Sequence, residues 1–267
     1  MSAPFTVLVF SKTVAYRHKS IEAGIRAFQA LAEASANTHH PFIVEASEDA
    51  ETTFTTTNLA RYRVIILLQA SGVFLTSEQL AVLEAQVKLG QTGVVGVHAA
   101  LGALQSTTVD PAGFYGRLLG GVFSEHPVPQ LGHVIIKAPG HPVVQPFLVR
   151  VSSSYEASAP EPFFSHFDEW YNYQPTSCAV ISANQTPTDA SSAESQSRLS
   201  ILLAADETTY EGGKHGENHP IAWVWPNFEN TGTRVFYTAL GHFAESYSDD
   251  VFVAHLKNAV LWVAKLL

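Results

Sequence analysis

Histidines at the ends of apolar runs are the residues of this sequence best suited to chemistry. His98 directly follows the apolar run at residues 93–97, and His242 follows the run that ends in TALG. His18 lies in the polar segment after the first apolar run. A neutral imidazole accepts a proton or binds a metal near neutral pH, and an imidazolium returns the proton. We therefore expect acid–base or metal-ligand chemistry from these side chains.

The segment GVHAA around His98 resembles a nucleophile elbow. Its small residues permit a sharp turn after a strand and the close approach of a substrate. Because the elbow residue is histidine rather than serine or cysteine, we predict that His98 acts as general base, general acid or metal ligand. The competing interpretation is a histidine bonded to backbone at a strand end. The elbow context favours a functional role.

A second candidate is the acidic and aromatic segment FDEWYNY at residues 167–173. A carboxyl group packed against an aromatic ring has its pKa raised by desolvation, which suits general acid catalysis. We predict that Glu169 transfers protons and that Trp170 and Tyr171 bind substrate by stacking on a sugar ring. The alternative is an exposed acidic turn beside core aromatics.

Further candidates occupy three polar segments. Arg17 and His18 lie near the expected start of a helix, where free backbone amides favour an anionic or hydroxyl-rich ligand. We predict that both bind substrate, unless they only cap and solvate the loop. The segment HGENHPIAW lacks the HExxH order of helical zinc sites, and His219, at a strand entry, is its better candidate for substrate or metal binding. His126 follows a Gly-Gly turn and could close over a pocket.

The apolar pattern predicts the elements that must position these residues. Strands followed by helices in the first half, one helix opened by the capping box TSEQ, predict a parallel sheet with right-handed crossovers. Ligands of such sheets bind beyond the carboxyl ends of the strands. If the strands before His98 and His242 are parallel neighbours, both histidines stand on one rim. The expected strands are 6–10, 42–46, 64–68, 93–97, 134–138, 148–151, 199–204, 221–225 and 234–239, with a last helix over 252–263.

Composition excludes several classes of protein. The 267 residues carry 15 Lys and Arg against 24 Asp and Glu, a formal charge of −9, so neither a nucleic-acid surface nor an anionic-membrane surface is expected. No apolar run is long enough to span a bilayer, and no basic leader opens the chain, so we expect a cytoplasmic protein. The single cysteine, Cys178, excludes an intrachain disulfide framework. We predict that residues 184–197 form an exposed loop.

Six ordered motifs resemble the trehalose-utilisation (ThuA-like) family. FSKTVAYRHKSI, GVVGVHAA, FYGRLLGG, DEWYNY, HPIAW and RVFYTALGHFAESY extend the resemblance from Val7 to Val263. It implies one domain over residues 1–267 with a flavodoxin-like three-layer α/β/α fold around a mainly parallel sheet, related to class I glutamine amidotransferases. Those relatives carry cysteine at the elbow, where this chain has His98, and a partner histidine near the position of His242. Cysteine-dependent glutaminase chemistry is therefore not expected.

The family links the chain to disaccharide catabolism, including keto-sugars. We expect a carbohydrate-active hydrolase, lyase or isomerase in which His98, His242 and Glu169 share proton transfer. A divalent metal such as zinc is compatible with these residues together with His18 and His219. The alternative is a non-catalytic sugar-binding or sensor protein, and a third reading is a subunit that takes its nucleophile from a partner. The expected partner is a small carbohydrate, and a homo-oligomer is compatible with the sequence.

Overall fold

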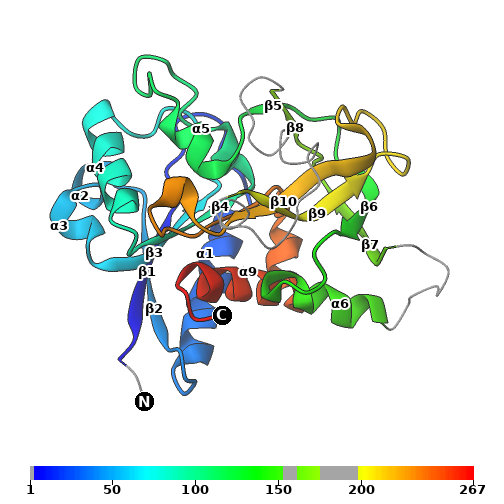
Figure 1. Cartoon of the computed structure of the whole chain (residues 1–267), viewed down its shortest axis with the longest axis horizontal. Coiled ribbons are helices and arrows are strands. Elements are labelled where there is room, and N and C mark those ends of the chain that lie inside the picture. The colour runs from blue at the N-terminus through cyan, green and yellow to red at the C-terminus, as the bar shows by residue number, and fades with distance from the viewer. Residues whose placement is uncertain (1–2, 153–160, 175–197) are drawn as a thin grey trace.

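The computed structural model describes residues 3–152, 161–174 and 198–267. A mixed α/β fold surrounds a nine-stranded sheet in the order β2-β1-β3-β4-β11-β10-β9-β6-β7 (Figure 1). Its strands are β1 (Phe5–Phe10), β2 (Phe42–Ser47), β3 (Tyr62–Leu68), β4 (Gly93–Val97), β6 (Gln130–Ile136), β7 (Phe163–Asp168), β9 (Ser200–Asp206), β10 (His219–Trp225) and β11 (Val235–Thr238). A small second sheet pairs β5 (Phe123–Glu125) with β8 (Asn172–Tyr173). The helices are α1 (Ile21–Ser35), α2 (Ala50–Thr53), α3 (Thr56–Leu59), α4 (Ser77–Lys88), α5 (Phe114–Leu119), α6 (Gln145–Ser152) and α9 (Asp250–Val263).

The core of the sheet is parallel, as the alternation of strands and helices predicts. Strands β2, β1, β3, β4 and β11 are paired in parallel. Helices α1 and α9 lie on one face and α4 and α5 on the other (Figure 1). Two glycines of β4 permit this close packing: a Cβ at Gly93 would lie 2.5 Å from the backbone of α9, and one at Gly96 would lie 3.0 Å from a side chain of α5. The predicted capping box opens α4, since Thr76 and Gln79 exchange hydrogen bonds.

The prediction of a mainly parallel sheet is wrong for the other half. Strands β11, β10, β9, β6 and β7 pair antiparallel throughout. Parallel neighbours need a long crossover, whereas antiparallel neighbours need only a loop that reverses the chain. The loops from β9 to β10 and from β10 to β11 contain only short 3₁₀ turns, so they reverse the chain.

The strand predicted over residues 148–151 is also wrong, because this segment lies within helix α6. Its apolar residues have helical rather than alternating spacing. Phe147 and Val151, four residues apart, are both buried, and α6 packs against α9. The period of the buried residues, rather than their β-branched type, decided the structure of this segment.

Two features of the sequence analysis lie outside the described residues, namely Cys178 and the loop predicted at 184–197. Within the residues that the structure does describe, no helix is both long and apolar enough to cross a membrane.

A buried histidine of α9 makes the stability of the fold sensitive to pH. His255 is fully buried, and burial lowers its pKa from 6.5 to about 4. One ring nitrogen, Nδ1, lies 2.7 Å from the carbonyl oxygen of Val143, and Nε2 has no hydrogen-bond partner among the described residues. The ring is therefore neutral in the folded state, and Nδ1–H donates to the carbonyl.

Acidification from pH 6.5 to pH 4 is expected to destabilise the fold through His255, because there the unfolded chain binds a proton that the folded chain does not. Above pH 6.5 this contribution is constant. The variant His255→Asn keeps a donor to Val143 and cannot titrate. Its free energy of unfolding should fall less between pH 7.5 and pH 4.5 than that of the wild type, by up to about 3 kcal/mol. Urea unfolding at the two pH values measures the difference, and equal losses would contradict the expectation.

Candidate active site

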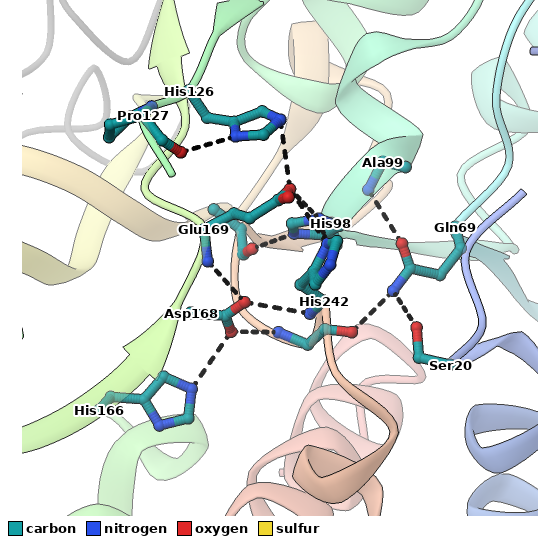
Figure 2. Close-up of polar contacts among 12 residues, drawn as sticks. Ser20, Gln69, His98, Ala99, His126, Pro127, His166, Asp168, Glu169 and His242 are labelled. Atoms are coloured by element: carbon teal, nitrogen blue, oxygen red, sulfur yellow. Dashed lines mark hydrogen bonds and ion pairs between the residues drawn. The ribbon is translucent and has the colours of Figure 1, made fainter. Parts of the chain in front are cut away.

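His98 stands on a sharp turn at the carboxyl end of β4, as the elbow pattern predicts. Its φ is +50°, an uncommon value for a residue with a Cβ. Nδ1 lies 2.5 Å from the carbonyl oxygen of Ala239, which can only accept, so the proton is on Nδ1. Nε2, the other ring nitrogen, faces the cluster shown in Figure 2.

His242 follows β11, the parallel neighbour of β4, so both predicted histidines stand on one rim. His242 Nδ1 lies 3.2 Å from Nε2 of His98. The loop that carries His242 is held by Asp168, which accepts hydrogen bonds from the backbone amides of Gly241 at 2.8 Å and His242 at 3.2 Å. The predicted proximity of the two histidines is therefore present in the structure.

Glu169 reaches the same cluster from the turn between β7 and β8. Its Oε2 lies 3.0 Å from Nδ1 of His242, 3.3 Å from Nε2 of His98 and 3.4 Å from Nε2 of His126 (Figure 2). Burial acts to raise the pKa of Glu169, but hydrogen bonds and charges from His242 and His98 outweigh it and lower the pKa below its ordinary value. Glu169 is thus a carboxylate, contrary to the raised pKa that its aromatic neighbours predict.

His18 completes the cluster from the loop before α1. Its ring meets those of His98 and His242 edge-on, at centroid distances of 5.0 and 5.1 Å. Burial, together with repulsion from the neighbouring histidines, lowers the pKa of His18 to about 3. Its Nδ1 is buried and has no hydrogen-bond partner among the described residues.

These four residues form a candidate metal centre. One ligand atom from each of His18, His98, Glu169 and His242 lies within 4.8 Å of the others. Three imidazole nitrogens and a carboxylate oxygen form a donor set that zinc accepts. The carbonyl bonded to Nδ1 of His98 is the kind of partner that fixes the tautomer of a metal-binding histidine.

Gln69 is a residue of the site that the sequence analysis missed. It is fully buried, and its Nε2 donates to the carbonyl of Gly241 at 2.7 Å and to Ser20 Oγ at 3.0 Å. The amide therefore joins the loop of His242 to the start of α1. Its position directly after β3, at the same rim as His98, was the signal that could have revealed it.

A cavity of about 450 Å³ opens onto the cluster. His18, Glu169 and Tyr171 line it, as does His126, which the sequence analysis expected to close over a pocket. Nδ1 of His126 lies 2.9 Å from the carbonyl oxygen of Pro127, and Nε2 faces Glu169. The other lining residues are small or aromatic: Ala15, Tyr16, Ser71, Gly72, Ala99, Gly102 and Phe123.

Three predicted substrate-binding residues do not line this cavity. Arg17 is turned to Glu22 and Glu48, at 3.0 and 2.8 Å. Trp170 is fully buried, stacks on Tyr210 and donates from Nε1 to a backbone carbonyl, which leaves no face free for a sugar. His219 is also fully buried, behind the backbone of Tyr171.

Comparisons with known proteins agree with this fold and show the family. The chain is similar to a crystal structure of a protein from Bacteroides uniformis ATCC 8492 described as ThuA-like, with a TM-score of 0.68 and 23% identity over 98% of this chain and 93% of that one. At this identity the likeness shows the fold alone. No curated protein gives a significant match. The family model ThuA, described as trehalose utilisation, matches residues 6–263. The chain therefore belongs to the ThuA family, whose description implies a role in sugar metabolism.

Proposed function

We propose that this protein is an enzyme that acts on a sugar or keto-sugar through histidine and glutamate acid–base chemistry, assisted by a divalent metal. The observation that carries the proposal is the convergence of ring nitrogens on Oε2 of Glu169. The Nε2 atoms of His98 and His126, whose Nδ1 atoms face backbone carbonyls, lie 3.3 and 3.4 Å from this carboxylate oxygen. A ring nitrogen and a carboxylate oxygen this close share a proton or a metal ion, because two lone pairs would repel one another.

The residues of the cluster fit a zinc ion. His18, His98, His242 and Glu169 would hold it, and Nδ1 of His18, which has no hydrogen-bond partner in the described part of the chain, supports this assignment. A bound zinc ion supplies a Lewis acid that polarises a carbonyl or lowers the pKa of a water. His219, proposed from sequence as another possible ligand, is not among the clustered residues.

The cavity favours an uncharged substrate. Among the described residues that line it there is no lysine or arginine, and Arg17 is paired elsewhere. Tyr16, Phe123 and Tyr171 offer apolar surface to the carbon face of a sugar ring, and Glu169 and His126 face the same space. Glu169 and His126 are placed to exchange protons with a substrate, which suits hydrolysis, elimination or isomerisation alike.

The alternative is a non-catalytic sugar-binding protein, favoured by the histidine at an elbow where related amidotransferases carry cysteine. The variant His98→Ala separates the two. An enzyme should lose turnover of trehalose or its keto derivatives, whereas a binding protein shows no turnover in the wild type and keeps its affinity. The exposed His39→Ala is the matched control.

We also propose that the chain folds as a single flavodoxin-like domain, that it is located in the cytoplasm and that it is able to form a homo-oligomer.

Zinc is expected to stabilise the purified, chelator-treated protein. At a free concentration about 100 times Kd, binding to the folded state alone adds about 2.7 kcal/mol, which raises Tm by about 5–10 °C. Differential scanning calorimetry with metal analysis measures both. Mg²⁺, which prefers oxygen ligands, is the control and should have little effect. No bound metal and no effect of chelator on Tm or activity would remove the metal from the proposal.

A further inference from the structure

The turn that carries Glu169 is anchored on both sides. On one side, the carboxylate of Asp168 binds the backbone of Gly241 and His242. On the other, the carbonyl of Tyr171 lies 2.7 Å from Nε2 of His219. Since Glu169 lies between the two anchors, its position in the cluster depends on both.

The second anchor also sets the wall of the cavity. The ring of Tyr171 packs against that of His98, with centroids 4.3 Å apart and an angle of 37° between the planes. Tyr171 lines the cavity as well. A displacement of its backbone would therefore move a surface that contacts both the substrate space and a candidate metal ligand.

The partners of His219 decide where its protons lie. Nε2 faces a backbone carbonyl, which only accepts, so Nε2 carries a proton. Nδ1 lies 2.8 Å from Oε1 of Glu207 and 2.6 Å from the hydroxyl of Tyr210. Burial raises the pKa of Glu207, but hydrogen bonds from His219 and from backbone amides outweigh it and lower the pKa to about 2. Glu207 is then an ionised acceptor, and it meets the Nδ1 side of the ring together with the Tyr210 hydroxyl.

We propose that His219 and Glu207 form a hydrogen-bonded pair that positions Tyr171, and through it Glu169 and His98. His219 is then a positioning residue rather than the substrate-binding residue that the sequence predicts. The proposal rests on the proposed function only for the role of Glu169, and its first tests need no metal.

The hydrogen bond from His219 to Tyr171 is tested by ¹⁵N NMR of the His219 ring in the wild-type protein at pH 7.5. Nε2 is expected at the shift of a protonated ring nitrogen, and a bare Nε2 would overturn the anchor on Tyr171. In Glu207→Gln, the shifts of both His219 ring nitrogens should change, and the ring-proton resonances of His98, which lie in the ring current of Tyr171, should shift. The exposed Glu211→Gln is the matched control and should leave both unchanged. Unmoved His98 resonances in Glu207→Gln would overturn the positioning role.

Zinc affinity provides the link to function. Loss of a residue that hydrogen-bonds to a metal ligand costs about 10- to 100-fold in metal affinity. Glu207 acts on the ligands through His219 and Tyr171, so we expect a loss at the lower end, about tenfold, for Glu207→Gln. Glu207→Asp, which keeps the charge, should recover part of this loss. Equal affinities of wild type and Glu207→Gln would overturn the coupling to Glu169. If the wild type binds no zinc, the metal in the proposed function fails, whereas the NMR results still decide the pair.

Discussion

Replacing Glu169 with glutamine is expected to lower zinc affinity by about 100-fold or more. Loss of a residue that only hydrogen-bonds to a metal ligand already costs about 10- to 100-fold, and Glu169 is itself a candidate ligand. The amide is neutral, so it removes the only carboxylate among the four candidate ligands. It also replaces the charged acceptor 3.0 Å from Nδ1 of His242 with a neutral amide, which accepts only at its oxygen. Turnover of a sugar substrate should be lost with it, since Glu169 is the carboxylate that faces the cavity. Isothermal titration with Zn²⁺ measures the affinity.

The matched control for this prediction is Glu245→Gln. Glu245 lies three residues after His242 but is exposed, and the structure does not place it in the cluster. Its substitution should leave zinc affinity within about twofold, in line with the small effects of surface changes. Wild-type affinity in Glu169→Gln would show that the cluster is not a metal centre. Retained turnover would remove Glu169 from proton transfer.

Replacing Asp168 with asparagine is expected to destabilise the fold by about 3 kcal/mol, because buried donors that lose an acceptor cost about 1–3 kcal/mol each. Asp168 is fully buried, and its carboxylate accepts from the amides of Gly241, His242 and Glu169. An amide NH₂ placed among these donors cannot satisfy them all. Calorimetry should show a fall in Tm of about 6–12 °C. The exposed Asp250→Asn is the control.

The pH dependence of stability tests the same residue. Burial acts to raise the pKa of Asp168, but His166 and the backbone hydrogen bond from Gly241 outweigh it, so the pKa lies below 3.8. A carboxylate with a lowered pKa stabilises the fold fully above its ordinary pKa and loses that contribution as pH falls below it. Wild-type stability should therefore decline below pH 3.8 in part through Asp168. The variant should lack that part of the decline, and identical acid limbs in urea titrations would contradict the assignment.

The rim that carries His98 and His242 could be predicted because its determinants are local. Uninterrupted apolar runs before both histidines indicate buried strands, and small residues around His98 indicate a sharp turn. Strands β4 and β11 are parallel neighbours, so their carboxyl ends lie at the same edge of the sheet. The antiparallel half could not be predicted in the same way, because strand direction depends on pairing partners distant in the chain rather than on the pattern within a strand.

The roles within FDEWYNY show where local reasoning stops. Trp170 and Tyr171 are both aromatic and adjacent, so the sequence cannot tell which one reaches a cavity. In the structure Tyr171 lines the cavity and Trp170 packs against Tyr210 in the core. Both residues lie in the turn between β7 and β8, and the surrounding packing sets which of the two side chains faces the cavity.

The sequence by itself determined the family, the parallel core of the sheet and the histidines at its rim, since motif order, periodicity and strand ends are properties of short segments. Only the tertiary structure decided that Glu169 meets them as an ionised carboxylate and that Arg17 pairs with Glu22 and Glu48 away from the cavity. It also decided that His219 stands behind the site with Glu207. These outcomes depend on contacts between residues far apart in the chain, where burial and hydrogen-bond partners set both charge and direction.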